Sequence, residues 1–219
     1  MTPPPLTFPR PALDAALSAA LDDHAGGGRT RPSRLPSRIR KLLDLDRELT
    51  QQAPAGTGRA FTDHTGLGQG VDAAYTPLNA FCLALGLELL EAGFKQSEVV
   101  TWVRLTRPWL AREYPRIVAG PAGAAVPRTQ LALPGRSDRC YMVVSRILAL
   151  DELPEVEEAV AGAGSRRTPV TFAPKFFHGP EDLAAALARS PSNVRRWLII
   201  ECRMLAVRLH NALLATRHA

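Results

Sequence analysis

The chain has 219 residues, 46% of them hydrophobic, which is enough for one large or two small globular domains. Its formal net charge of +6 at pH 7 favours an anionic partner but does not determine the fold. The three cysteines Cys82, Cys140 and Cys202 form no CxxC pair, so neither a disulfide framework nor a zinc site is expected. We find no export signal and no apolar stretch of membrane-spanning length, so we expect a cytoplasmic protein with no membrane contact.

The N-terminal region predicts a tail followed by a helix. Residues 1–10 contain four prolines and are expected to form a flexible or extended tail. From Pro11 to His24, leucines recur every four residues among alanines, which predicts a helix that three consecutive glycines, residues 26–28, bring to an end.

A basic stretch from Arg29 to Leu49 comes next. Its first part holds six cations and no acid: Arg29, Arg31, Arg34, Arg38, Arg40 and Lys41. Apolar residues at Leu35, Ile39 and Leu42 then share one helical face, while Arg40 and Lys41 point away from it. This pattern is typical of a helix that presents cations to phosphate, although it also fits a solvated, arginine-rich surface helix.

Two short extended segments, Arg59–Asp63 and Val71–Tyr75, flank the glycine-rich sequence HTGLGQG. Two strands joined by such a loop predict a β-hairpin. A nucleotide-binding loop is not expected here, because the dinucleotide fingerprint requires a helix directly after the glycines.

Two helices are expected after the hairpin. Thr76 is a candidate N-cap and Pro77 suits the first helical position, and we expect the helix to close at Gly93. A second helix follows, which Pro108 should kink or divide. Trp102 and Trp109 lie seven residues apart in it, which favours core or dimer packing on one face.

A linker of small residues over 119–127 suggests a domain boundary. Beyond it, the sequence predicts strands at 129–133, 139–150 and 168–177, an acidic helix over 153–161, a short helix over 180–189 and a long helix from Ser192 to Thr216. That last helix has a wide apolar face, which must pack against this domain or against a second subunit.

No catalytic set of residues is evident. The five histidines have no HxxxH or HExxH spacing, and no nucleophile elbow, P-loop or paired-carboxylate motif is present. We therefore expect a non-enzymatic protein with no catalytic residue, cofactor or metal. An enzyme with a site scattered through the sequence stays a less favoured alternative.

The order of basic helix, hairpin and capped helix over about residues 38–104 resembles the winged helix-turn-helix of MerR-type transcription regulators. The resemblance is carried by RAFTD at the first strand, by Tyr75-Thr76 before a helix, and by residues that end one helix and begin the next: Leu89, Leu90, Gly93, Phe94 and Glu98. The Thr-(Ile/Leu)-Arg-Tyr-Tyr recognition run of that family is absent, and residues 37–41 stand in its place.

The resemblance implies a mainly α fold with small β elements. We expect an N-terminal winged helix-turn-helix with a dimerisation helix over residues 11–118, and a small C-terminal α+β domain over 128–219. The implied function is a homodimeric regulator that binds double-stranded DNA. The expected DNA-binding residues are Arg29, Arg31, Arg34, Ser37, Arg38, Arg40, Lys41, Arg59 at the base of the wing and His64 at its tip. The alternative is a protein–protein interaction module with a basic surface segment.

Overall fold

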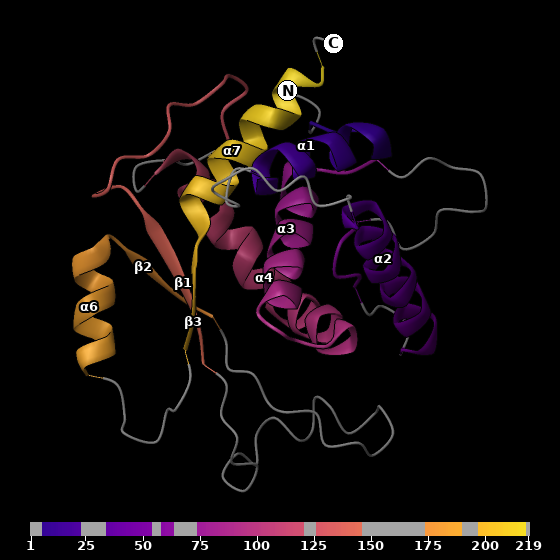
Figure 1. The fold of residues 1–219 in the computed structure, drawn as a ribbon, viewed down its shortest axis with the longest axis horizontal. Coiled ribbons are helices and arrows are strands. Elements are labelled where there is room, and N and C mark those ends of the chain that lie inside the picture. The colour runs from indigo at the N-terminus through magenta and orange to yellow at the C-terminus, as the bar shows by residue number, and fades with distance from the viewer. Residues whose placement is uncertain are drawn as a thin grey trace, which may run out of the picture.

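The structure is a computed structural model that describes residues 6–22, 34–53, 58–63, 74–120, 126–145, 174–189 and 197–217. Within these residues the chain is mainly helical with a small three-stranded antiparallel sheet, which confirms the predicted mixture of elements (Figure 1). The helices are α1 (Arg10–Asp22), α2 (Leu35–Gln52), α3 (Pro77–Glu91), α4 (Gln96–Ala119), α6 (Pro180–Ala188) and α7 (Cys202–Ala215), and the strands are β1 (Cys140–Ser145), β2 (Lys175–His178) and β3 (Trp197–Glu201). Of these helices, none has the length and apolar character that a membrane span requires.

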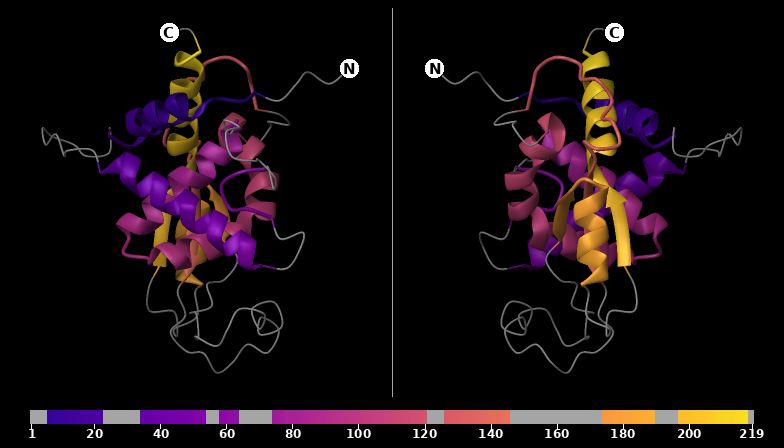
Figure 2. Two further views of the ribbon diagram at one scale, coloured as in Figure 1. Left: turned by 90° about the vertical axis from the view of Figure 1, so that its right-hand side faces the viewer. Right: turned by 90° about the vertical axis from the view of Figure 1, so that its left-hand side faces the viewer.

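The elements lie in layers around α3 and α4. In Figure 1 the sheet and α6 lie on one side of this helical centre and α2 lies on the other. Figure 2 (right) shows α6 in front of the sheet, and Figure 2 (left) shows α2 crossing the opposite side of the molecule. The sheet and the basic helix therefore belong to opposite faces of the described structure.

One hydrophobic core joins the beginning and the end of the described chain. It contains Leu13 and Leu17 of α1 together with Leu209 and Leu213 of α7, all of them almost fully buried. The domain boundary predicted over residues 119–127 falls largely on undescribed residues, and the described residues on both sides of it contribute to this core. Phe8, in the predicted tail, is also buried in it.

Helix α3 is the central helix, and its start follows the sequence signal closely. Thr76 is the N-cap, its hydroxyl accepts a hydrogen bond from the backbone N–H of Asn79 at 3.2 Å, and Pro77 occupies the first turn. Nearly every side chain from Asn79 to Leu89 is buried, as expected for a helix that is covered on all sides. Gly86 allows close packing, because a Cβ there would lie 3.3 Å from both Phe61 and Val99.

Helix α4 continues as one helix through Pro108 and Pro115, so the proline at 108 does not divide it. The two tryptophans of the predicted pair have different environments. Trp102 is 3% exposed and belongs to the core, whereas Trp109 is 41% exposed. Only Trp102 therefore serves packing within the described residues.

The strand order in the sheet is β2-β1-β3, with both pairs antiparallel. In β1 the buried side chains of Cys140, Met142 and Val144 belong to the core, where Ile200 of β3 joins them. Alternate residues of a strand point to opposite faces, so these three define the inner face of the sheet.

Two predicted elements in this half are wrong. The long helix expected from Ser192 begins only at Cys202, because Trp197–Glu201 pairs with β1 as strand β3. The carboxylate of Glu201 then caps α7 by accepting the backbone N–H groups of Arg203 and Met204. The strand expected over 129–133 is also absent, because the amide of Asn211 forms two 2.8 Å hydrogen bonds with the backbone of Leu131.

The remaining predicted elements here are partly described. The strands expected over 139–150 and 168–177 correspond to β1 and β2 in their described parts, and the short helix over 180–189 corresponds to α6. The acidic helix expected over 153–161 lies outside the described residues.

The first strand of the predicted hairpin, Arg59–Asp63, is not a strand in the structure. Its backbone is held by side chains of neighbouring helices instead. Tyr75, expected in the second strand, forms an antiparallel bridge with Phe8, with N–O distances of 2.9 Å in both directions. The loop between them, residues 64–73, lies outside the described residues.

Candidate nucleic-acid interface

Helix α2 has one buried face and one exposed basic face. Ile39, Leu42 and Asp46 are buried against the rest of the molecule. Arg34 at the N-cap and Arg40 and Lys41 in the first turns are exposed. The predicted division of this helix between core residues and outward-pointing cations is therefore confirmed over its described residues.

The cations of α2 differ in whether they have an acidic partner. Within the described parts of the chain, Arg34, Arg40 and Lys41 form no ion pair. Arg38 is bonded to the carboxylate of Glu91 at the end of α3, and both side chains stay partly exposed. The positive charge available to an external anion thus comes first from the three unpaired residues.

Three other predicted DNA-binding residues lie outside the described residues: Arg29, Arg31 and His64. Ser37 is exposed on the basic face, and its hydroxyl donates to the carbonyl of Arg34 at 2.9 Å. Arg59 is half-buried in the segment between α2 and α3, and its Nε is buried without a hydrogen-bond partner. The structure therefore gathers the described residues 34–41 in the first turns of α2, and Arg59 comes from a separate segment.

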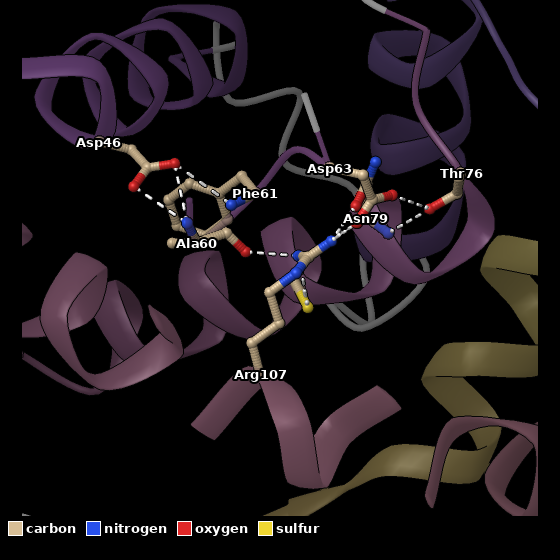
Figure 3. Close-up of polar contacts among 8 residues, drawn as sticks. Asp46, Ala60, Phe61, Asp63, Thr76, Asn79 and Arg107 are labelled. Atoms are coloured by element: carbon tan, nitrogen blue, oxygen red, sulfur yellow. Dashed lines mark hydrogen bonds and ion pairs between the residues drawn. The ribbon is translucent and has the colours of Figure 1, made fainter. Parts of the chain in front are cut away.

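The segment that contains Arg59 is anchored by a buried carboxylate (Figure 3). Asp46 accepts hydrogen bonds from the backbone N–H of Ala60 at 3.0 Å and from that of Phe61 at 3.2 Å. Arg104 of α4 donates to the same carboxylate at 2.7 Å and to the Thr50 hydroxyl at 2.9 Å. These contacts join α2, α4 and the intervening segment at one point.

A second arginine of α4 completes the anchor. Arg107 donates to the carbonyl of Ala60 at 2.7 Å and is also bonded to the Asp63 carboxylate and the Asn79 amide oxygen (Figure 3). The hydroxyl of Thr76 donates to Asp63 at 3.3 Å. This hydrogen bond joins two described residues that lie on either side of residues 64–73 in the sequence.

The charge of Arg107 also controls the ionisation of Asp63. Partial burial alone would raise the pKa of this carboxyl, but the hydrogen bond and positive charge of Arg107, with help from Asn79 and Thr76, hold its pKa below the usual 3.8. Asp63 is therefore a carboxylate at neutral pH.

The cysteines are not suited to nucleophilic chemistry. All three are free and buried. Burial raises the pKa of the Cys82 thiol to about 11 and that of Cys140 to about 12, and it raises the pKa of Cys202 well above 9.0. Among the described residues no group of three His, Cys, Asp or Glu side chains could hold a metal ion.

Two histidines fall in the described residues, and neither has a catalytic environment. His210 is buried in α7, and its Nε2 lies 2.9 Å from the carbonyl oxygen of Thr129, which gives it a structural partner. His178 is exposed at the end of β2.

Two shallow clefts border α2. One lies between α2 and the turn that joins α3 to α4, and it is lined by Arg38, Leu45, Leu90, Phe94, Lys95, Gln96 and Ser97. The other lies between α1 and α2, and it is lined by Arg10, Asp14, Pro36, Ser37, Arg40 and Lys41. The second cleft places Arg10 beside the predicted basic residues.

Sequence reasoning missed Arg10, Arg104, Arg107 and Asp46. A signal for Asp46 was present, because it lies four residues after Leu42 and seven after Ile39 on the apolar face of α2. An acid at such a position requires a buried partner. No comparable signal marked the two arginines of α4, whose partners are distant in sequence.

Comparison with known proteins gave no match: no protein family, no curated protein and no solved structure is similar to this chain.

Proposed function

We propose that the protein is a non-enzymatic DNA-binding regulator that contacts the backbone of double-stranded DNA through the first turns of α2. The observation that carries the proposal is the exposed set of Arg34, Arg40 and Lys41, which have no acidic partner within the described residues. By contrast, Arg104 and Arg107 of α4 are used for internal ion pairs. Cations left unpaired on an exposed helix favour an external anion, and duplex DNA offers a dense row of phosphates.

The shape of the site also supports a large, extended ligand. Helix α2 lies across one side of the molecule (Figure 2, left). Its basic residues occupy the exposed face of a helix of 18 residues. An α-helix fits the major groove of B-DNA, whereas a small anion would require a more enclosed site.

The proposal retains the basic helix of the winged helix-turn-helix and modifies its wing. Arg59–Asp63 is bound to α2 and α4 and is not the first strand of a wing, so the proposal assigns no contact to a strand there.

A fluorescence anisotropy titration with a labelled duplex of mixed sequence tests the proposal. We expect the variant with both Arg40→Ala and Lys41→Ala to bind DNA more than about tenfold more weakly, because it loses two cations that neutralise phosphate. Each neutralised phosphate contributes about 0.9 to the magnitude of the slope of log K against log salt. The magnitude of this slope should also fall. Arg38→Ala should have a smaller effect, since Arg38 already pairs with Glu91.

Arg112→Ala is the matched control, because Arg112 is an exposed arginine of α4 with an acidic neighbour, Glu113, at 3.1 Å. Its binding should equal that of the unchanged protein. Equal affinity and equal salt slope for the Arg40/Lys41 variant would contradict the assignment of α2.

The proposal includes a homodimer, and an exposed apolar pair on α4 is the reason. Leu105 and Trp109 are 48% and 41% exposed and lie four residues apart, on one helical face. Analytical ultracentrifugation tests this part: Leu105→Lys with Trp109→Lys should convert a dimer to a monomer. A monomeric unchanged protein would contradict it.

The same apolar pair favours a second candidate function, a module that binds another protein. A pull-down at two salt concentrations, with and without nuclease, separates the two functions. A protein partner that remains bound after nuclease treatment and is lost with the Leu105/Trp109 variant favours the interaction module. Loss of all bound material after nuclease favours DNA binding.

A further inference from the structure

The cleft between α1 and α2 has a composition that suits a phosphate. Its volume is about 570 Å³, and its lining includes Arg10 of α1 with Arg40 and Lys41 of α2. Asp14 is the one acid in the lining, so the formal charges of these four residues leave a positive excess. Residues with cationic side chains from two separate helices thus border one cleft.

Arg10 is held in place by its neighbour on α1. Its Nε donates to Oδ1 of Asp14 at 2.7 Å, and each side chain is 30% exposed. No other hydrogen bond of the Arg10 guanidinium is present within the described part of the chain. The N–H groups of its two terminal nitrogens are therefore available as hydrogen-bond donors. Together they can bind two oxygens of one phosphate.

The other cleft beside α2 makes a useful contrast. Its arginine, Arg38, is already bonded to Glu91, and its lining contains one further cation, Lys95. Arg40 and Lys41 line the α1–α2 cleft and have no acidic partner within the described residues. The α1–α2 cleft therefore has more cations without an acidic partner among the described residues, and it is the site we choose for an anion.

We propose that the α1–α2 cleft receives one phosphate of the DNA backbone, with Arg10 as a contact from α1 beside Arg40 and Lys41. Asp14 acts as a positioning residue that orients Arg10. This inference rests on the proposed function and extends it, because it adds a second helix to the binding surface.

The test uses the full chain, a labelled duplex of mixed sequence and a series of salt concentrations. Arg10→Ala should weaken binding about fivefold or more and lower the magnitude of the slope of log K against log salt by less than one full phosphate contact, because Arg40 and Lys41 still contact the shared phosphate. Arg10→Lys should recover most of the slope, because it keeps the charge. Arg112→Ala, with its own acidic neighbour, is the matched control.

A double-mutant cycle tests whether one phosphate is shared. If Arg10 and Arg40 hold the same phosphate, the loss in the double alanine variant should be smaller than the product of the two single losses. Independent effects would overturn the shared site. Thermal melting followed by circular dichroism confirms that each variant is folded.

The outcomes separate this inference from the proposed function. In one outcome, the Arg40/Lys41 variant binds DNA weakly while Arg10→Ala has the affinity and salt slope of the unchanged protein. That result would overturn the phosphate site in the α1–α2 cleft and would leave the proposed DNA binding by α2 in place. If the unchanged, folded protein does not bind duplex DNA even at low salt, both are overturned.

Discussion

Arg104 and Asp46 form an ion pair inside the molecule, with Nη2 of Arg104 2.7 Å from Oδ1 of Asp46. The Asp46 side chain is 2% exposed and that of Arg104 is 16% exposed. The same carboxylate accepts backbone N–H groups of Ala60 and Phe61. Breaking a buried ion pair lowers the stability of the folded protein strongly, because the partner that remains is a buried charge without a counter-charge.

Asp46→Ala should therefore destabilise the protein by about 3–5 kcal/mol, because it leaves the largely buried Arg104 guanidinium without its carboxylate and the N–H groups of Ala60 and Phe61 without an acceptor. Urea unfolding followed by circular dichroism measures the change. Asp44→Ala is the control, since Asp44 pairs with Arg47 at 3.4 Å on the exposed face of α2. Its cost should stay below about 1 kcal/mol. A similar cost for both variants would contradict the anchoring role of Asp46.

Acid should weaken the contact between Asp63 and Arg107. The pKa of Asp63 is lowered from 3.8 in the folded protein, so its carboxylate contributes stability above pH 3.8, and that contribution is lost as the pH falls through the lower folded value. Urea midpoints of the unchanged protein and of Asp63→Asn, taken from neutral pH to about pH 3, should converge in acid. A constant difference between the two proteins over this range would argue against the effect.

The cysteines should be protected from thiol reagents in the folded protein. Burial raises the pKa of Cys82 to about 11 and of Cys140 to about 12, so almost no thiolate is present at about pH 8. A chromogenic disulfide reagent should report almost no reaction in native buffer and all three thiols in denaturant. Fast labelling of one cysteine in native buffer would show that its surroundings open. The rate of colour development measures how fast the thiols react.

Helices whose signals are local were predictable from the sequence. Thr76 and Pro77 define the start of α3 because an N-cap hydroxyl and a proline act on their own first turn. The exposed cations at Arg40 and Lys41 followed from the 3.6-residue period of α2. These features depend only on neighbouring residues.

Features that depend on distant residues were not predictable. Trp197–Glu201 is compatible with the helical period of the residues after it, and only its pairing with β1 makes it a strand. Arg59–Asp63 has the composition of a strand, yet its N–H groups are bound by a carboxylate from α2. Arg10 entered the candidate site for a similar reason, because the approach of α1 to α2 is a tertiary contact.

The packing of α1 against α7 bears on how the protein is made. Leu13 and Leu17 are synthesised long before Leu209 and Leu213, which complete the same core. The apolar face of α1 is therefore without this partner until α7 has been made. Contacts between residues so far apart in sequence form slowly, and exposed apolar surface promotes aggregation in the meantime. A chain cut short before α7 should accordingly be a substrate for chaperones and proteases.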